Sequence, residues 1–152
     1  MPKASVKRLI ECKKEDLIKL VLDIEKYPEF VPFCFDAKVY ENKNEGDLTK
    51  IIADLTIGKG PFKDTYKSDV VFDRNKDTIF VKNIEGPLNH LSNKWTFTDK
   101  KNGITEITFD IDFEIKNKFL NSLMVVSFQF GLEKIADAFQ KRAEELFGSS
   151  KN

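Results

Sequence analysis

Few side chains in this sequence could take part in catalysis. His90 is the only histidine, and it lies in the segment Asn89-His90-Leu91 without a carboxylate or nucleophile at a recognisable motif spacing. A Ser-His-Asp or Cys-His site needs a base that a carboxylate orients. His90, at a predicted loop-to-strand junction, is therefore interpreted as a surface or hydrogen-bonded histidine rather than as a catalytic base.

The two cysteines, Cys12 and Cys34, lie on different predicted elements and form no CxxC pair. Two reduced thiols are the simplest interpretation for such a pair. A structural or catalytic zinc site needs several His or Cys ligands, and the chain offers three scattered candidates in all. The sequence therefore predicts no metal and no cofactor.

Three carboxylates, Asp110, Asp112 and Glu114, recur at every second position near residue 110. In a strand they share one face, opposite Phe109, Ile111 and Phe113, and this polar face is expected to lie in solvent. Carboxylates for acid–base chemistry are thus not predicted in the interior. The absence of a catalytic arrangement favours a protein that is not an enzyme.

The elements that position these side chains follow from hydrophobic periodicity. Alternation between apolar and polar residues, with turn-forming residues such as Asn-Glu-Gly-Asp and Lys-Asn-Gly in between, predicts short antiparallel connections. A helix is predicted for residues 13–26, ended by Pro28. A long amphipathic helix is predicted for residues 117–147, with apolar residues three and four apart. The predicted strands are 5–12, 37–41, 49–57, 62–73, 78–85, 91–98 and 105–115.

Clean alternation gives each strand one wet face and one buried face, so the sheet needs a cover on one side. The long C-terminal helix is the candidate. The predicted fold is α+β, a helix-grip curved antiparallel sheet of about seven strands around that helix, formed by a single domain over residues 1–152. Such a sheet tends to leave a space between its concave face and the helix.

Composition narrows the function classes. Lys plus Arg equals Asp plus Glu at 25 each, so there is no overall electrostatic footprint for nucleic acid. The 14 Phe residues suit an apolar interior or the lining of an apolar cavity. The N-terminal residues have no apolar segment typical of a secretory signal, and a cytoplasmic location is expected.

Several segments resemble one known family. Residues 27–34, YPEFVPFC, resemble the YPxFVPxC signature of the coenzyme Q-binding START-domain family, part of the polyketide cyclase superfamily. Residues 85–97 are similar to its EGPFxxLxxxWxF block, with Leu88 in place of the aromatic residue. Residues 112–115 and 138–143 are similar to its DFEF and AFxxRA segments. The similarity runs in order over nearly the whole chain.

The resemblance implies a helix-grip (START/Bet v-like) fold that holds an apolar cavity and binds ubiquinone or a related polyprenyl lipid. It also implies a carrier or chaperone role in respiratory electron transport and ubiquinone synthesis. Ubiquinone would then be a bound ligand and not a cofactor. Bacterial members are also labelled ribosome-association toxin RatA, which implies binding to the large ribosomal subunit, or oligoketide cyclase/lipid transport protein, which implies an enzyme. The ribosome alternative requires a basic face, for which the candidates are Lys94, Lys100, Lys101, Lys116 and Lys118.

Two sets of ligand-contacting residues are predicted. The alternation places the first set on the inner face of the sheet, opposite the charged residues of the same strands. Tyr66, Asn93 and Asn89 are the candidates for holding the quinone head. A second set would form the mouth and a peripheral contact with the inner face of the membrane: Tyr27, Phe30, Phe33, Phe119 and Val125. The predicted ligand-binding residues are Leu55, Ile57, Tyr66, Trp95, Phe97, Phe109, Ile111 and Phe113 of the sheet, with Leu123 and Phe128 of the helix.

Overall fold

A seven-stranded antiparallel sheet dominates this computed structural model, which describes residues 3–59, 61–85, 88–115 and 118–148. The order across the sheet is β1-β7-β6-β5-β4-β3-β2, so the first strand pairs with the last and the others form a meander. The predicted curved antiparallel architecture is confirmed. The strands are β1 (Lys3–Glu11), β2 (Cys34–Glu45), β3 (Leu48–Lys59), β4 (Phe62–Asp73), β5 (Thr78–Glu85), β6 (Leu88–Asp99) and β7 (Ile104–Ile115).

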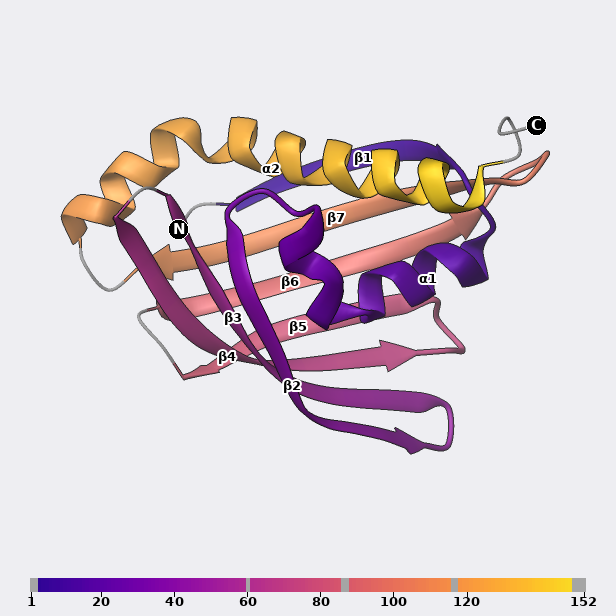
Figure 1. Cartoon of the computed structure of the whole chain (residues 1–152), viewed down its shortest axis with the longest axis horizontal. Helices are drawn as coiled ribbons and strands as arrows, with labels where there is room; N and C mark the ends of the chain where they lie inside the picture. Colours follow the sequence, from indigo (N-terminus) through magenta and orange to yellow (C-terminus); the bar gives the residue numbers. More distant parts are fainter. Residues whose placement is uncertain (1–2, 60, 86–87, 116–117, 149–152) are drawn as a thin grey trace.

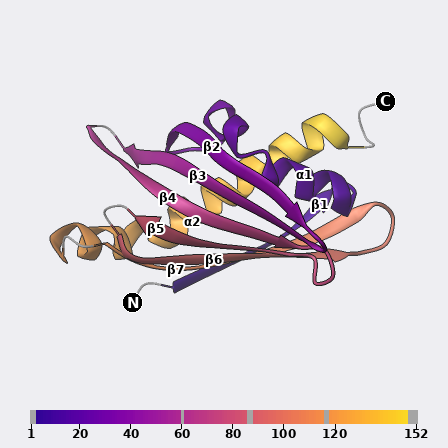
Figure 2. The same ribbon diagram turned by 90° about the horizontal axis from the view of Figure 1, so that it is seen from below.

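The helices cover one face of this sheet. They are α1 (Lys14–Leu22), the 3₁₀ helix η1 (Ile24–Glu29) and α2 (Lys118–Phe147). Because β1 and β2 lie at opposite edges, α1 and η1 carry the chain from one edge to the other on the side where α2 also runs (Figure 1). Seen from below, the strands fan out and curve about α2 (Figure 2). This is the helix-grip arrangement predicted from the sequence.

The core lies between the inner face of the sheet and the helices. Alternate residues of each strand face inward, as the register of β6 with β7 shows, where Trp95 pairs with Phe109 and Phe97 with Ile107. All four are buried, whereas Lys94 and Asp110, paired with each other one step away, are exposed. The alternating pattern therefore translates directly into one buried face and one wet face.

The predicted helix over residues 13–26 is wrong in its second half. The α-helix ends at Leu22, where the backbone N–H of Asp23 bonds the carbonyls of both Lys19 and Leu20. A separate 3₁₀ helix follows and contains Pro28. Proline removes a hydrogen-bond donor and blocks continuation of an α-helix, but it is tolerated in a short 3₁₀ turn where little of the i→i−4 pattern exists.

The predicted short strand 37–41 is also wrong, since β2 extends over twelve residues. β2 is an edge strand, and most of its side chains are exposed, so its apolar alternation is weak. Its pairing with β3 is interrupted by register shifts between Cys34 and Asp36 and between Val39 and Glu41. Backbone pairing rather than side-chain burial defines this strand, and alternation does not report backbone pairing.

Candidate ligand-binding site

Along the middle of β4 to β7 the inner face carries no charged side chain; Asp64 and Asp99, toward the ends of β4 and β6, share its alternation. The side chains of this middle part share a direction toward α2, and most are buried. Among the predicted ligand residues, Tyr66, Trp95, Phe97, Phe109 and Phe113 are buried, Leu55 and Ile111 are half-buried, and Ile57 is 36% exposed. The inward positions are Tyr66, Ser68, Val70, Phe72, Ile79, Val81, Asn83, Leu91, Asn93, Trp95, Phe97, Thr105, Ile107, Phe109, Ile111 and Phe113.

An aromatic cluster joins this face to α2 and to η1. It consists of Tyr27, Phe30, Trp95, Phe109 and Phe139. Trp95 stacks on Phe109 with ring centroids 4.2 Å apart and planes at 24°. The Phe139 ring makes edge contacts with Trp95 at 5.0 Å, Phe30 at 5.1 Å and Tyr27 at 5.3 Å. The cluster thus fixes the position of α2 above the sheet, and it places two predicted mouth residues, Tyr27 and Phe30, against the core.

Polar contacts hold the turn of residues 27–34 in place. The Tyr27 hydroxyl donates a hydrogen bond to the carbonyl of Val21, and burial raises the pKa of this phenol. Arg142 of α2 donates from Nη2 to Glu29 Oε1 at 2.9 Å, and its guanidinium lies 5.2 Å from the centroid of the Phe30 ring. The two sequence segments that resembled family motifs, 27–34 and 138–143, are therefore in contact with each other.

Phe33 lies where three elements converge. Its backbone has a φ of 71°, in the left-handed region that non-glycine residues seldom occupy. Its carbonyl accepts a hydrogen bond from the Gly58 N–H at the end of β3, at 3.0 Å. A Cβ at Gly131 of α2 would lie 3.8 Å from the Phe33 ring. The turn, the β3 end and the middle of α2 thus meet at one end of the inner face.

Five other predicted residues cannot be placed. The side chains of Phe119, Leu123, Val125 and Phe128 on α2, and that of Asn89, lie outside the residues that the structure describes. Membrane contact through Phe119 and Val125 therefore stays a prediction.

Five uncharged polar side chains interrupt the apolar inner face. Thr105 Oγ1 donates a hydrogen bond to the Cys12 carbonyl at 2.7 Å, and we call the other four the inner polar band: Tyr66, Ser68, Asn83 and Asn93. Ser68 on β4 pairs in register with Asn83 on β5, and Asn93 on β6 pairs with Val81 of β5. Asn83 Oδ1 accepts a hydrogen bond from the Leu91 N–H at 2.8 Å. Sequence analysis proposed Tyr66 and Asn93 but missed Ser68 and Asn83. Their place in the alternation, at inward positions, was the signal that could have found them.

Tyr66 should affect stability at alkaline pH. Burial raises the pKa of its phenol from 10.0 to about 12, and the nearby Ser68 hydroxyl partly opposes this rise. The folded state therefore holds the Tyr66 proton more tightly than the unfolded state does. The contribution of the protonated Tyr66 to stability is full below pH 10 and is lost as the pH rises to about 12. We expect the free energy of unfolding to fall over this window by roughly 2–3 kcal/mol more than in Tyr66→Phe. Urea unfolding at a series of pH values measures this difference. The prediction is contradicted if the free energy of unfolding falls equally with pH in the parent protein and in Tyr66→Phe.

His90 lies within β6 and not at a loop-to-strand junction, which corrects the sequence interpretation. Its Nε2 is 3.6 Å from Asp112 Oδ2, a contact that the register of β6 and β7 creates. Asp112 is only 25% exposed at its side chain and so is less solvated than predicted. Both residues are on the outer face of the sheet, opposite Leu91 and Phe113. The pair is thus separated from the inner face by the sheet itself.

The cysteines are free thiols of low reactivity. Cys12 is buried, Cys34 is half-buried, and burial raises the pKa of each thiol to about 11. Nucleophilic attack requires the thiolate, which is scarce at neutral pH when the pKa is that high. In the part of the chain that the structure describes, no group of three or more His, Cys, Asp or Glu residues could hold a metal ion.

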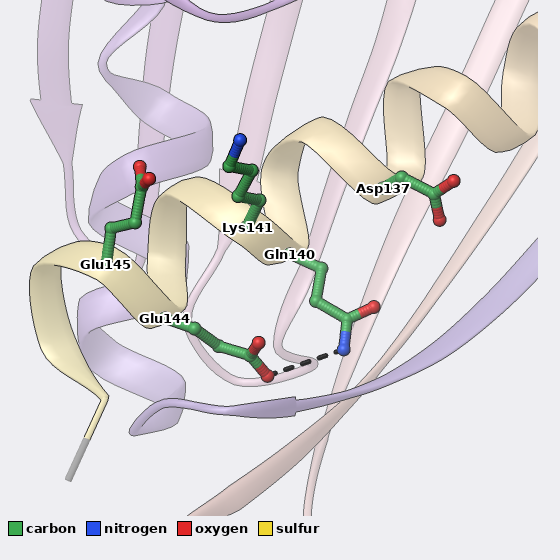
Figure 3. Close-up of a pocket in the computed structure, with 5 residues that line it drawn as sticks. All are labelled: Asp137, Gln140, Lys141, Glu144 and Glu145. Atoms are coloured by element: carbon green, nitrogen blue, oxygen red, sulfur yellow. Dashed lines mark hydrogen bonds between the residues drawn. The ribbon is translucent and has the colours of Figure 1, made fainter. Parts of the chain in front are cut away.

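A polar depression of about 410 Å³ lies along the outer side of α2 (Figure 3). Gln140 and Glu144 point to one side of the helix, and Lys141 and Glu145 to the other. The first pair bonds β1: Gln140 Nε2 donates to the Leu9 carbonyl at 3.1 Å, and Glu144 Oε2 accepts from the Glu11 N–H at 3.1 Å. Gln140 and Glu144 thus attach α2 to the edge strand. The residues that line the depression are all polar or charged, which does not suit a lipid tail.

Comparison with known proteins defines the family. The family model described as polyketide cyclase/dehydrase and lipid transport matches residues 10–140, and this chain belongs to that family. The mitochondrial coenzyme Q-binding protein COQ10 of Dictyostelium discoideum is 33% identical over 135 residues, 86% of this chain and 63% of that protein. The chain therefore spans slightly less than two thirds of that relative.

A second relative is similar over nearly its full length. The ribosome association toxin RatA of Rickettsia prowazekii is 30% identical over 142 residues, covering 91% of this chain and 94% of that protein. A solved START superfamily protein from Mycobacterium smegmatis shares the fold, with a TM-score of 0.81, 19% identity and coverage of 95% of this chain and 98% of that one. Among the described residues, no helix is both long and apolar enough to cross a membrane.

Proposed function

We propose that this protein binds ubiquinone or a related polyprenyl lipid between the inner face of the sheet and α2. It acts as a carrier or chaperone that supports respiratory electron transport and ubiquinone synthesis, and it does not transform its ligand. The observation that supports this most is the inner face of β4 to β7, which is mainly aromatic and aliphatic and carries the four uncharged side chains of the inner polar band. Such a surface suits a long apolar tail with a small neutral head. The name of the COQ10 relative points to the same ligand.

Mass spectrometry of organic extracts tests this function. The full chain is purified from cells without detergent, extracted, and compared with an unrelated protein of similar size purified in the same way. We expect ubiquinone or another polyprenyl lipid to be enriched in the extract. Quinone titration of the stripped protein, followed by the fluorescence of Trp95, the only tryptophan, gives the affinity. No enrichment and no saturable titration would overturn the proposal.

The carrier function predicts that His90 is dispensable. His90 and Asp112 face away from the inner surface, so a ligand beneath α2 does not contact them. His90→Ala should therefore leave quinone affinity and complementation of a deletion strain unchanged. Loss of complementation in a folded His90→Ala protein that still binds quinone would instead favour an enzyme, as the cyclase part of the family description suggests.

A second candidate function is binding to the large ribosomal subunit. The lysines that the sequence predicted to form a basic face do not favour it, because Lys94 lies opposite Asp110 in the register of β6 with β7 and Lys100 Nζ is 3.9 Å from Glu106 Oε1. Lys116 is outside the described residues. On the outer face of β2 and β4, however, three lysines lie over two aromatic rings that are almost half exposed. These are Lys38 and Lys67 at Tyr40, 5.0 and 5.2 Å from its centroid, and Lys63 at Phe35, 4.0 Å away.

Lysine beside exposed aromatic rings is an arrangement that binds RNA backbone and stacks on bases. Cosedimentation with isolated large subunits tests this candidate. If it holds, Lys63→Glu with Lys67→Glu should abolish cosedimentation, whereas Lys82→Glu on neighbouring β5 should not. Cosedimentation that is equal in all variants, or absent from the parent protein, would reject the candidate.

A further inference from the structure

The inner polar band contains two atoms that lack hydrogen-bond partners. Ser68 is fully buried, and its Oγ has no partner among the described residues. Asn93 Oδ1 is likewise buried without a partner. Ser68 lies close enough to influence the Tyr66 phenol, but the geometry does not make a hydrogen bond between them. Buried polar atoms are almost always paired, and each exception calls for an explanation.

The band lies on three adjacent strands, and its side chains share one face of the sheet. Ser68 and Asn83 are cross-strand neighbours on β4 and β5, and Asn93 is diagonal to Asn83 on β6. Neighbours in such positions have Cβ atoms about 5 Å apart, and diagonal ones about 7–8 Å. One small ring lying on the sheet could therefore contact several of these side chains at once.

The chemistry of the band selects a neutral head group. The pKa of Tyr66, about 12, keeps its hydroxyl protonated at neutral pH, so it donates. Serine hydroxyls and asparagine amides can also donate. No Lys or Arg shares the inward positions of β4 to β7, so a phosphate or carboxylate buried against these strands would find no counter-charge on them. The band therefore suits carbonyl or ether oxygens on an uncharged ring.

We propose that Ser68 and Asn93, with Tyr66 and Asn83, form the subsite that binds the ligand's uncharged, oxygen-bearing head group. This inference rests on the proposed lipid-binding function and adds the orientation of the ligand to it. The aromatic cluster fills the interior on the Trp95 side of Asn93. The tail then leaves in the other direction, toward the end where Phe33 meets Gly131.

Two probes separate head recognition from tail burial. The first is a ubiquinone with a short isoprenoid tail, and the second is an isoprenoid hydrocarbon of the same length without the ring. The full-length stripped protein is titrated with each, as parent, Ser68→Ala and Asn93→Leu. Ser92→Ala is the matched control, because Ser92 lies on β6 next to Asn93 but on the opposite face.

We expect each inner-face variant to bind the quinone about tenfold more weakly, the effect of one lost hydrogen bond to a buried group. Hydrocarbon affinity should not change, and Ser92→Ala should behave as the parent. The ligand-free Ser68→Ala protein should melt no lower than the parent, because a methyl group replaces an unpaired buried hydroxyl. A merely structural Ser68 would lower the melting temperature and weaken both probes.

The outcomes distinguish this subsite from the proposed function. If the parent binds the quinone and both variants bind it equally well, the subsite is wrong and lipid binding stands. If the parent binds neither probe, the proposed function fails and the subsite fails with it. If the parent binds only the hydrocarbon, the ligand is a lipid without this head, and the subsite is again overturned.

Discussion

Replacing Phe139 with alanine is expected to lower the free energy of unfolding by about 3–5 kcal/mol. Phe139 is 2% exposed, and its ring is the contact through which α2 meets Trp95 of the sheet and both Tyr27 and Phe30 of the crossing segment. Truncation removes a large buried apolar side chain and leaves a cavity that the rigid sheet below cannot fill. The three edge-on ring contacts, each worth about 0.5–1.5 kcal/mol beyond area burial, are part of this loss and place it toward the upper end of the range.

Phe130→Ala is the matched control on the same helix. The Phe130 side chain is 64% exposed, and Lys134 Nζ lies over its ring, 4.6 Å from the centroid. Substitution there should change the free energy of unfolding by less than about 0.5 kcal/mol. Urea titrations of the three proteins, followed by circular dichroism, measure both effects. A loss below about 1 kcal/mol in Phe139→Ala would show that the aromatic cluster does not hold α2 to the sheet.

Most of the fold could be predicted because one face of the sheet is exposed to solvent and the other is buried, which produces a regular alternation of polar and apolar residues. Strands such as β7 alternate Phe109, Ile111 and Phe113 with Asp110 and Asp112, and the burial pattern follows that alternation. Strands β4, β5 and β7 were predicted to within a residue for this reason. Where burial does not alternate, as in β2, the sequence carries no periodic signal, and the extent of the strand could not be derived.

The break between α1 and η1 was missed for a related reason. Leu17, Leu20, Val21 and Ile24 keep helical spacing across Asp23, and all four apolar side chains are buried. The periodicity therefore continues although the helix does not. The helix ends because the chain must turn toward the opposite edge of the sheet, since β1 and β2 are farthest apart in the strand order. Local patterns do not encode this long-range constraint.

The candidate site was predicted in part. Its aromatic lining follows from strand faces, but the contacts of Phe139 with Trp95, Tyr27 and Phe30 join residues up to 112 positions apart, which spacing cannot reveal. The inner polar band was seen only at Tyr66 and Asn93. Polar residues at inward positions make the alternation less regular, and a single one does not by itself indicate a binding site. Here those interruptions are the positions that we propose bind the head group of the ligand.

Lengthening the isoprenoid tail of a ubiquinone probe is expected to raise its affinity at least tenfold per added unit over the first units. Each buried CH₂ contributes about 0.8 kcal/mol, and a tenfold change in affinity corresponds to about 1.4 kcal/mol. An isoprene unit has several carbons, so even partial burial outweighs the cost of ordering its bonds, about 0.5–1.5 kcal/mol for a flexible group. The gain should stop once the tail passes the end of the inner face near Phe33 and enters water.

Titrations with a series of probes that share one ring test this expectation through Trp95 fluorescence. Because the lining residues described are uncharged, the affinities should not depend on salt concentration, unlike binding to an ionic surface. Tyr40→Ala on the outer face should reproduce the parent series, since its side chain is 48% exposed and points away from α2. The unit at which the affinity levels off measures the distance from the head group to the mouth. Affinity that stays flat from the shortest tail onward would mean that the ligand binds by its ring alone, and the inner face would then not be a lipid-tail site.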